Sequence, residues 1–323
     1  MLPRRGLRTA WTITAASACL TLAQGLFAAS TDDKIPPWSL ALEQRLQPWC
    51  PGDCASGVSF TAVYKNGDRI LVFVGVHHVF TPRNSTIRAI DGGFAATSPA
   101  IVITEGFPTA MGESPPPLVK QASKRGTAEE DQFTKSEGMY AISRAITDGI
   151  PFLGGEPTRS EQVQALQRRG FTPTDIAFAY LVGGLSQSVR SGDLASTSDP
   201  KLAESFAQWS RAFSDQYHLP TLSLDDFKTR YQAMFRVELT HDAGFSKRAE
   251  PGTSSPVALL NQTDMVTRDE HLLATIEEEL ELKKRVLVVY GGSHWTTLAQ
   301  ALQRRFGKPR ITPYPMVAQD IVH

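Results

Sequence analysis

The stretch RVLVVYGGSH, residues 285–294, is the part of the sequence that decides the fold. Its apolar run is continuous and rich in β-branched residues, which is typical of a central strand buried on both faces of a sheet. Short apolar runs also occur in buried helices, but the glycines that follow this run favour a strand. The predicted strand therefore ends in a Gly-x-x-His motif, from Gly291 to His294.

Three further apolar runs resemble this strand and lie far from it in the sequence. They are Arg69–Val74, Ala100–Thr104 and Ile150–Leu153. Another run, Ser59–Tyr64, precedes the first of them across Asn66-Gly67, which is the strongest short-range signal of a β-hairpin. We therefore expect an α/β fold with a mixed, largely parallel central sheet and flanking helices. The elements before Arg159 and the strand and helix at the end of the chain could be two related halves of one sheet.

Helical periodicity covers most of the chain between and after these runs. The predicted helices are Ser136–Asp148, Ser160–Arg169, Thr174–Gln187, Lys201–Tyr217, Ser223–Val237, Asp264–Leu282 and a last helix from His294 to about Gly307. Two segments rich in Pro, Gly, Ser or charge, Gly106–Thr134 and Ala243–Pro256, are expected to be loops. Long loops of this kind are either lids and binding loops or plain surface disorder.

Each buried run leads into a residue that can carry chemistry. His78 follows the first run, Glu105 and Glu156 follow the next two, and His294 follows the last. In open α/β sheets the ligand crevice lies outside the carboxyl ends of the strands, so we expect these side chains to meet at one edge. One histidine or glutamate at a strand end is more often structural. The coincidence of four strand ends is what predicts an active site.

Imidazole and carboxylate side chains allow two kinds of chemistry at this edge. They are ligands for Zn²⁺, Mn²⁺ or Co²⁺ ions, and they are equally a general acid–base set. His294 stands just before a predicted helix, whose dipole disfavours the imidazolium form, so we expect a neutral ring. His77 points the opposite way from His78 in an extended chain, so His78 is the expected site residue.

The first 30 residues have the composition of a secretory signal peptide. Arg4, Arg5 and Arg8 form a positively charged start, an apolar stretch follows, and Ala28-Ala29-Ser30 offers a cleavage site. We therefore expect an exported protein, either periplasmic or secreted. Contact with a membrane is expected only through this peptide or through a lipid on Cys19, whose flanking residues make a poor lipoprotein box.

Composition agrees with export and excludes one class of partner. Lys plus Arg equals Asp plus Glu, at 33 each, so the chain lacks the basic footprint of a nucleic-acid-binding protein. Cys50 and Cys54 lie in the segment 31–58 and are spaced for a local disulfide in an oxidising compartment. Two free thiols are the alternative, and no second cysteine pair could complete a structural zinc site. Residues 59–323 are expected to form one domain.

At the strand ends the sequence resembles the TraB/Tiki superfamily, which is related to erythromycin-esterase-like enzymes and ChaN-like haem-uptake lipoproteins. The matching residues are FVGVHH (73–78), ITE (103–105), LGGEPT (153–158) and YGGSHW (290–295), with Arg268-Asp269 in the helix before the last strand. Their order and spacing cover about Ser59 to Leu302. The sequence departs from the family at Gly106, where many relatives carry an acidic residue.

The resemblance implies two related halves facing each other across the site, and a divalent-metal-dependent hydrolase of the protease or esterase type. The site residues that it implies are His78, Glu105, Glu156, Arg268 and His294. The histidines would be metal ligands or catalytic bases, and the glutamates would be their carboxylate partners. Arg268 would stabilise an oxyanion or an anionic substrate, unless it forms a salt bridge with Asp269 or Glu270.

Three other interpretations stay open. A metal-independent esterase would use one histidine as the base on water, as the erythromycin-esterase-like relatives imply. A periplasmic carrier would bind haem or another ligand, as the ChaN-like relatives imply. A degenerate member of the family would keep the fold without the activity. In the two enzyme interpretations, the substrate is a peptide or an ester.

Overall fold

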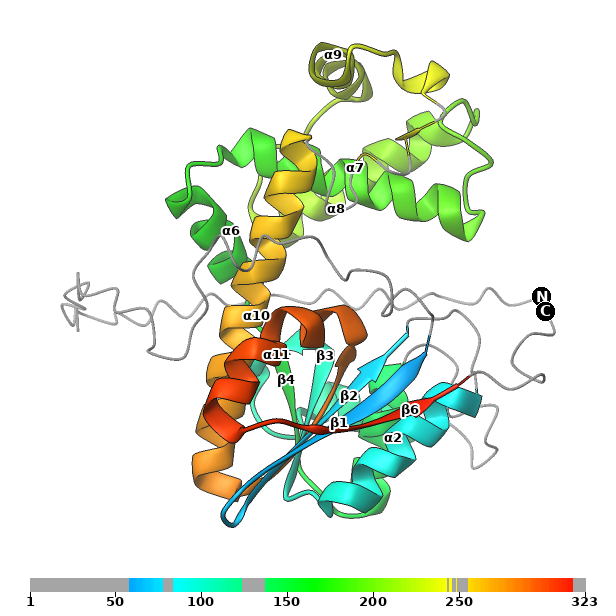
Figure 1. Ribbon diagram of the computed structural model, residues 1–323. Coiled ribbons are helices and arrows are strands. Elements are labelled where there is room, and N and C mark those ends of the chain that lie inside the picture. The colour runs from blue at the N-terminus through cyan, green and yellow to red at the C-terminus, as the bar shows by residue number, and fades with distance from the viewer. Residues whose placement is uncertain are drawn as a thin grey trace, which may run out of the picture. The chain divides into compact units, whose positions relative to one another are not determined.

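The computed structural model describes residues 58–77, 84–123, 137–242, 244–245, 248 and 255–315 of the 323-residue chain (Figure 1). The predicted signal peptide and the cysteine pair, Cys50 and Cys54, lie outside the described residues, and so does His78. The described part contains no helix that is both long and apolar enough to cross a membrane.

Six strands form one sheet in the order β4-β3-β5-β2-β1-β6. Their bounds are Ser59–Asn66 (β1), Arg69–Val76 (β2), Ile101–Pro108 (β3), Phe152–Glu156 (β4), Arg285–Gly291 (β5) and Arg310–Tyr314 (β6). The strands from β4 to β2 in this order run parallel, whereas β1 pairs antiparallel with both β2 and β6. The predicted α/β fold with a mixed, largely parallel sheet is therefore confirmed. The edge strand β6 was not predicted.

The hairpin of β1 and β2 forms where Asn-Gly predicted it. Asn66 pairs with Arg69, so only Gly67 and Asp68 make the turn. Gly67 has a φ angle of 62°, in the left-handed region that glycine adopts at no steric cost. The tight turn fixes the antiparallel register of β1 and β2.

Helices cover both faces of the sheet (Figure 1). The helices α10 (Pro256–Lys283) and α11 (Gly292–Phe306) pack on the face that carries Leu71 and Phe73. The opposite face, which carries Val72 and Val74, packs against α2 (Asn84–Thr97), α3 (Pro116–Ser123) and α5 (Glu137–Thr147). Because side chains alternate along a strand, β2 is apolar on both faces, as expected for a central strand.

The segment after Glu105 is more regular than predicted. Within the described part of Gly106–Thr134, the chain completes β3, forms a 3₁₀ turn at Thr109–Met111 (η2) and then enters α3, so the prediction of a loop is wrong there. The segment from Thr109 to Ser114 covers the edge strand β4. The Thr109 hydroxyl donates to the Gly154 carbonyl at 2.7 Å, and the Ser114 amide donates to the Phe152 carbonyl at 2.7 Å. These bonds satisfy backbone groups that an edge strand leaves unpaired.

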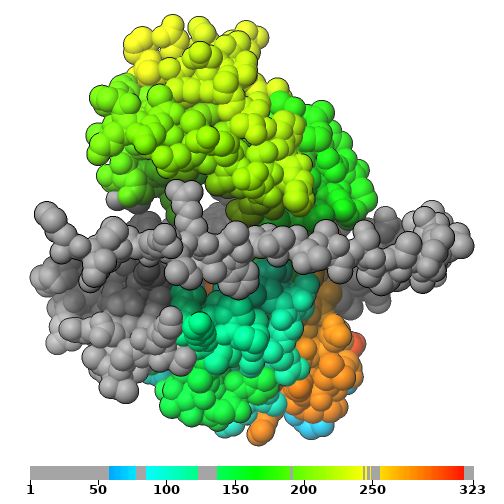
Figure 2. All heavy atoms as spheres, turned by 180° about the vertical axis from the view of Figure 1, so that it is seen from behind, coloured from blue at the N-terminus to red at the C-terminus, as the bar shows by residue number. Residues whose placement is uncertain are grey.

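The middle of the chain forms a helical region, as predicted. Its helices are α6 (Arg159–Arg168), α7 (Pro173–Ser191), α8 (Leu202–Tyr217), α9 (Leu224–Phe235) and the 3₁₀ turn η3 (Leu239–His241). Capping boxes start α6 at Thr158 and α7 at Thr172, because each threonine hydroxyl accepts from the amide of the acidic residue three positions later. Figure 2 shows the atoms of α7 to α9, green to yellow, packed closely against one another.

Helix α10 is longer than predicted. It starts at Pro256 rather than at Asp264, with Ser255 as the N-cap whose hydroxyl accepts from the Ala258 amide. Its first half packs into the helical region through Val257 and Leu260, and its second half packs on the sheet through residues such as Leu272. The apolar face therefore changes partner along the helix, and Arg268 lies where the change occurs.

Candidate active site

The structure brings together four of the five predicted site residues. Glu105 lies on β3, Glu156 ends β4, Arg268 lies on α10 and His294 lies in the first turn of α11. The fifth, His78, lies beyond the end of β2 and outside the described residues.

Arg268 joins the two glutamates. Its Nε donates to Glu156 Oε2 at 2.7 Å, and its Nη2 donates to Glu156 Oε1 at 2.6 Å and to Glu105 Oε1 at 2.9 Å. Burial by itself would lower the pKa of Arg268, but the hydrogen bond and charge of Glu156, with the charge of Glu105, hold it well above its usual range. The predicted alternative, a salt bridge to Asp269 or Glu270, is not what Arg268 forms.

Glu105 is held from three directions. Its Oε2 accepts from the Gly291 amide at 2.9 Å, and its Oε1 accepts from Arg268 and lies 3.5 Å from His294 Nε2. The Gly291 amide comes from the end of the neighbouring strand β5. The carboxylate is therefore fixed across the carboxyl ends of two parallel strands, where such folds place their ligands.

His294 forms a buried pair with Asp269. The ring Nδ1 lies 2.6 Å from Asp269 Oδ1, and both side chains are 3% exposed. Burial opposes a charge on the ring, but the charge and hydrogen bond of Asp269, assisted by Glu105, raise the pKa of His294 to about 9. The prediction of a neutral ring is therefore wrong, because two carboxylates outweigh the burial that opposes the charge. Helix α11 also begins at Gly292, so His294 lies inside its first turn rather than before it.

Tyr290 is a buried neighbour of the same groups. Its hydroxyl donates to Glu156 Oε1 at 3.2 Å, and its ring meets the His294 ring edge-to-face with 5.2 Å between centroids. Burial raises the pKa of Tyr290 well above its usual value, so the hydroxyl stays protonated and able to donate.

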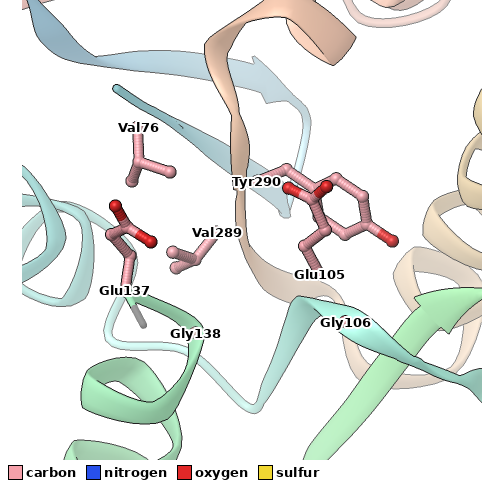
Figure 3. A pocket seen from close by; sticks show the side chains of 7 residues that line it. All are labelled: Val76, Glu105, Gly106, Glu137, Gly138, Val289 and Tyr290. Atoms are coloured by element: carbon pink, nitrogen blue, oxygen red, sulfur yellow. The ribbon is translucent and has the colours of Figure 1, made fainter. Parts of the chain in front are cut away.

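A pocket of about 220 Å³ opens beside Glu105 (Figure 3). It is lined by Val76, Glu105, Gly106, Glu137, Gly138, Val289 and Tyr290. In Figure 3, Glu105 and Tyr290 lie on one side of it and Glu137, from the start of α5, lies on the other. The pocket thus combines apolar walls with carboxylates, the composition expected of a small ligand site.

The described residues supply only two of the side chains that the predicted metal ion would need. Among the described residues, no group of three or more His, Cys, Asp or Glu side chains is arranged to hold a metal ion. His294 Nε2 and Glu105 Oε1 are two suitable donors, and 3.5 Å between them lets both reach one ion at about 2.0–2.2 Å. Both oxygens of Glu156 are bonded to Arg268, which favours a positioning role over the predicted metal ligation.

Three residues at this site were not predicted as site residues, namely Asp269, Tyr290 and Glu137. Asp269 and Tyr290 stood inside the matching motifs, and their burial beside polar groups is the signal that identifies them. Glu137 lay in a predicted helix without any motif, and only the tertiary structure brings it to the pocket.

Comparison of the chain with protein-family models, with curated proteins and with solved structures found no match. The resemblance to the TraB/Tiki superfamily therefore stays a prediction that depends on the motif residues. The geometry of the site stands independently of that resemblance.

Proposed function

We propose that the chain is an exported, metal-dependent hydrolase of the TraB/Tiki type that cleaves a peptide or ester bond at the carboxyl edge of its sheet. The observation that carries the proposal is the arrangement of His294 and Glu105, whose facing atoms lie 3.5 Å apart. Asp269 holds the other ring nitrogen, and Gly291 holds the other carboxylate oxygen. Metal-ligating histidines and carboxylates usually have their remaining atoms fixed in this way.

Three residues would hold the metal in this proposal, namely His294 and Glu105 with His78. A divalent ion bound there would polarise the substrate carbonyl and lower the pKa of a bound water. His294 ligates through Nε2 only after that atom gives up its proton. Asp269 keeps the Nδ1 proton in place and so selects the tautomer whose Nε2 faces the site.

Glu156 and Arg268 act together as a positioning pair. Their bidentate contact, with Nη2 shared to Glu105, fixes the direction of the Glu105 carboxylate. Because Arg268 is already paired with two carboxylates, it is poorly suited to an anionic substrate. Glu156 is poorly suited to carry a proton during hydrolysis, because Arg268 bonds both of its oxygens. The carboxylates that line the pocket are Glu105 and Glu137.

We also propose that the chain belongs to the TraB/Tiki superfamily and has two related halves, and the pairing of β2 with β5 is compatible with this proposal. Both strands lead into a Gly-x-x-His motif, and they are parallel neighbours in which Val76 pairs with Gly291. The two motifs therefore start at nearly the same level of one sheet edge.

A metal-independent esterase is the second candidate, and the protonation of His294 changes its expected mechanism, because the ring would act as an acid and not as the base on water. With a pKa raised to about 9, the ring carries a proton at neutral pH and could donate it from Nε2 to a leaving group. The haem carrier is less well supported, because the 220 Å³ pocket lies below the about 300–1,000 Å³ of drug-sized ligand sites.

The experiment compares the purified full chain with His294→Ala and Glu105→Gln, using fluorogenic peptides and nitrophenyl esters. Each protein is assayed after chelation and after adding back Zn²⁺, Mn²⁺ or Co²⁺. We expect activity only with metal, and loss of activity in both variants. His241→Ala is the control, because that side chain is 74% exposed and should not matter.

The other outcomes separate the candidates. Activity that survives chelation and is lost in His294→Ala would favour the metal-independent esterase. A Soret band on adding haem, absent in His294→Ala, would favour the carrier. Hydrolysis that is unchanged in both site variants would reject the proposal of this active site.

A further inference from the structure

We propose that Tyr290 is a positioning residue of this site, which fixes the Glu156–Arg268 pair, and through it Glu105, relative to His294. The inference rests on the proposed hydrolase function and concerns a residue outside the predicted set. It starts from the fact that Tyr290 and the next residue, Gly291, touch three of the site groups from the end of one strand.

The first contact is through the hydroxyl. Glu156 Oε1 accepts two hydrogen bonds, one from the Tyr290 hydroxyl at 3.2 Å and one from Arg268 Nη2 at 2.6 Å. The same Nη2 donates to Glu105 Oε1. The hydroxyl is therefore the first link of a hydrogen-bonded chain that runs through Glu156 and Arg268 to Glu105.

The second contact is made by the Tyr290 ring, which packs against His294. His294 in turn lies next to Glu105, the last residue of the hydrogen-bonded series. The Tyr290 ring meets the His294 ring at an interplanar angle of 83°, and His294 Nε2 lies 3.5 Å from Glu105 Oε1. The Gly291 amide holds the other oxygen of Glu105. Tyr290 and Glu105 both line the pocket that Figure 3 shows. Movement of Tyr290 would thus change the geometry between the two proposed metal donors.

The side chains and backbone around the Tyr290 phenol pack closely and restrict its movement. Tyr290 is 1% exposed, and a Cβ atom at residue 155 would lie 2.5 Å from its hydroxyl oxygen and 2.8 Å from a Leu272 methyl. The hydroxyl reaches Glu156 only because Gly155 has no side chain. A side chain held this firmly can transmit its position to the groups that it bonds.

Tyr64 provides a matched control on the same face of the sheet. It is also 1% exposed, and its hydroxyl accepts a hydrogen bond from Trp295 Nε1 at 3.0 Å rather than bonding to a site carboxylate. Tyr64→Phe therefore removes a buried hydroxyl from the same core without removing one from the site.

The kinetic test uses Tyr290→Phe and Tyr64→Phe in the metal-loaded full chain. We expect Tyr290→Phe to lower kcat by about tenfold or more, because a hydrogen bond to a charged group is lost, with KM changed less than about twofold. Tyr64→Phe should change neither constant by more than about twofold. A Tyr290→Phe enzyme with wild-type kcat, or an equal loss in Tyr64→Phe, would overturn the inference.

A second readout needs no activity. The Arg268 Nε proton is bonded to Glu156, so its ¹⁵N-edited NMR signal, assigned with Arg268→Lys, should exchange slowly with solvent. We expect exchange to speed up by about tenfold in Tyr290→Phe, where Glu156 has lost a donor, and to stay unchanged in Tyr64→Phe. Equal exchange in wild type and Tyr290→Phe would overturn the positioning role even if hydrolysis were established.

The two proposals fail in different ways. If His294→Ala and Glu105→Gln keep full activity, the hydrolase site is wrong, while the exchange measurement still decides whether Tyr290 holds Arg268. If Tyr290→Phe does not fold, Gly155→Ala displaces the hydroxyl instead and should give the same faster exchange. Slow exchange in a folded Gly155→Ala protein would then count against the inference.

Discussion

Helix α10 contributes to two buried regions that differ in their side chains. One region is apolar and the other is charged. The first half of the helix enters an aromatic cluster in the helical region, where Phe178, Phe206, Phe227 and Tyr231 stack ring against ring. The middle of the helix lies at the carboxyl edge of the sheet. There Arg268 bonds to Glu105 and Glu156, and Asp269 bonds to His294. One helix thus contributes to an apolar core and to a cluster of buried charges.

The two regions are expected to contribute differently to the stability of the folded state. Burial of apolar rings lowers the free energy of the folded state directly. Burial of charges costs free energy that their pairing does not always return, so a buried charged cluster is weak support for stability. Glu156 and Asp269 have side chains only 5% and 3% exposed. A cluster of this kind at the carboxyl edge of a parallel sheet is therefore expected of the proposed active site rather than of a region that stabilises the fold.

The largest effect should follow from Arg268→Met, which leaves two glutamates without their cation. We expect the free energy of unfolding to fall by about 3–5 kcal/mol, as for other broken buried ion pairs. Hydrolysis should fall by about a hundredfold or more, because the Glu105 carboxylate is no longer held in its orientation. Urea unfolding and steady-state kinetics measure the two effects.

The control for this variant is Arg169→Met. Arg169 pairs with Glu270 near the same part of α10, but the two side chains are 27% and 40% exposed. An exposed pair contributes about 0–1 kcal/mol, so little should change. If both variants lost similar stability, the distinction between a buried charged cluster and ordinary surface pairs would be wrong.

The aromatic cluster should respond in stability alone. Phe227 is fully buried and meets three other rings, so Phe227→Ala should cost about 3–5 kcal/mol. At temperatures where the variant stays folded, we expect kcat within about twofold of wild type. Thermal unfolding and kinetics on the same preparation check both points. A large fall in kcat in the folded variant would mean that the two regions are coupled.

The parts of this comparison that sequence could predict are those with local signals. The strand runs, their glycines and the polar residues at their ends predicted five strands and, among the described residues, Glu105, Glu156 and His294. Arg268 was predicted only through the family resemblance. Helix α2 was missed because Gly92 and Gly93 weaken the helical pattern. These glycines are required by packing, since Cβ atoms there would lie 1.9 Å from Tyr314 and 2.5 Å from Val74.

The protonation of His294 could not be predicted for a related reason. It depends on Asp269, which is 25 residues away and comes within 2.6 Å only in the folded chain. Strand β6 was missed because its residues are mostly exposed and include Pro313, so the run lacks the buried alternation of a strand. In each case the deciding contact is tertiary.

A smaller effect is expected from Asp269→Asn, which keeps the shape of the side chain. The amide would donate to His294 Nδ1 if it kept the contact, which forces the ring proton onto Nε2 and blocks ligation. We expect metal affinity and kcat/KM to fall by about 10–100-fold, the usual effect of losing an outer-shell partner. Calorimetric titration with Zn²⁺ gives the affinity, and wild-type affinity in Asp269→Asn would contradict the assignment.

The smallest expected effect is the pH dependence of metal binding, which involves the charged region and not the apolar one. Because the pKa of His294 is raised to about 9 without metal, the ring holds a proton at pH 7 that a metal ion must displace. We expect close to one proton released per metal bound at pH 7, and an affinity that rises about tenfold per pH unit and levels off above about pH 9. Calorimetry in buffers of different ionisation enthalpy measures the proton.

The same raised pKa has a consequence for the metal-free protein. His294 in the unfolded chain titrates near 6.5, so its charged contacts stabilise the fold fully below pH 6.5 and are lost as the pH rises through about 9. Urea midpoints should therefore fall between pH 6.5 and 9 in wild type and in Phe227→Ala alike. They should fall less in His294→Gln, which has no proton to lose. Equal slopes in wild type and His294→Gln, or no proton released on binding metal, would mean that the ring is neutral in the folded protein.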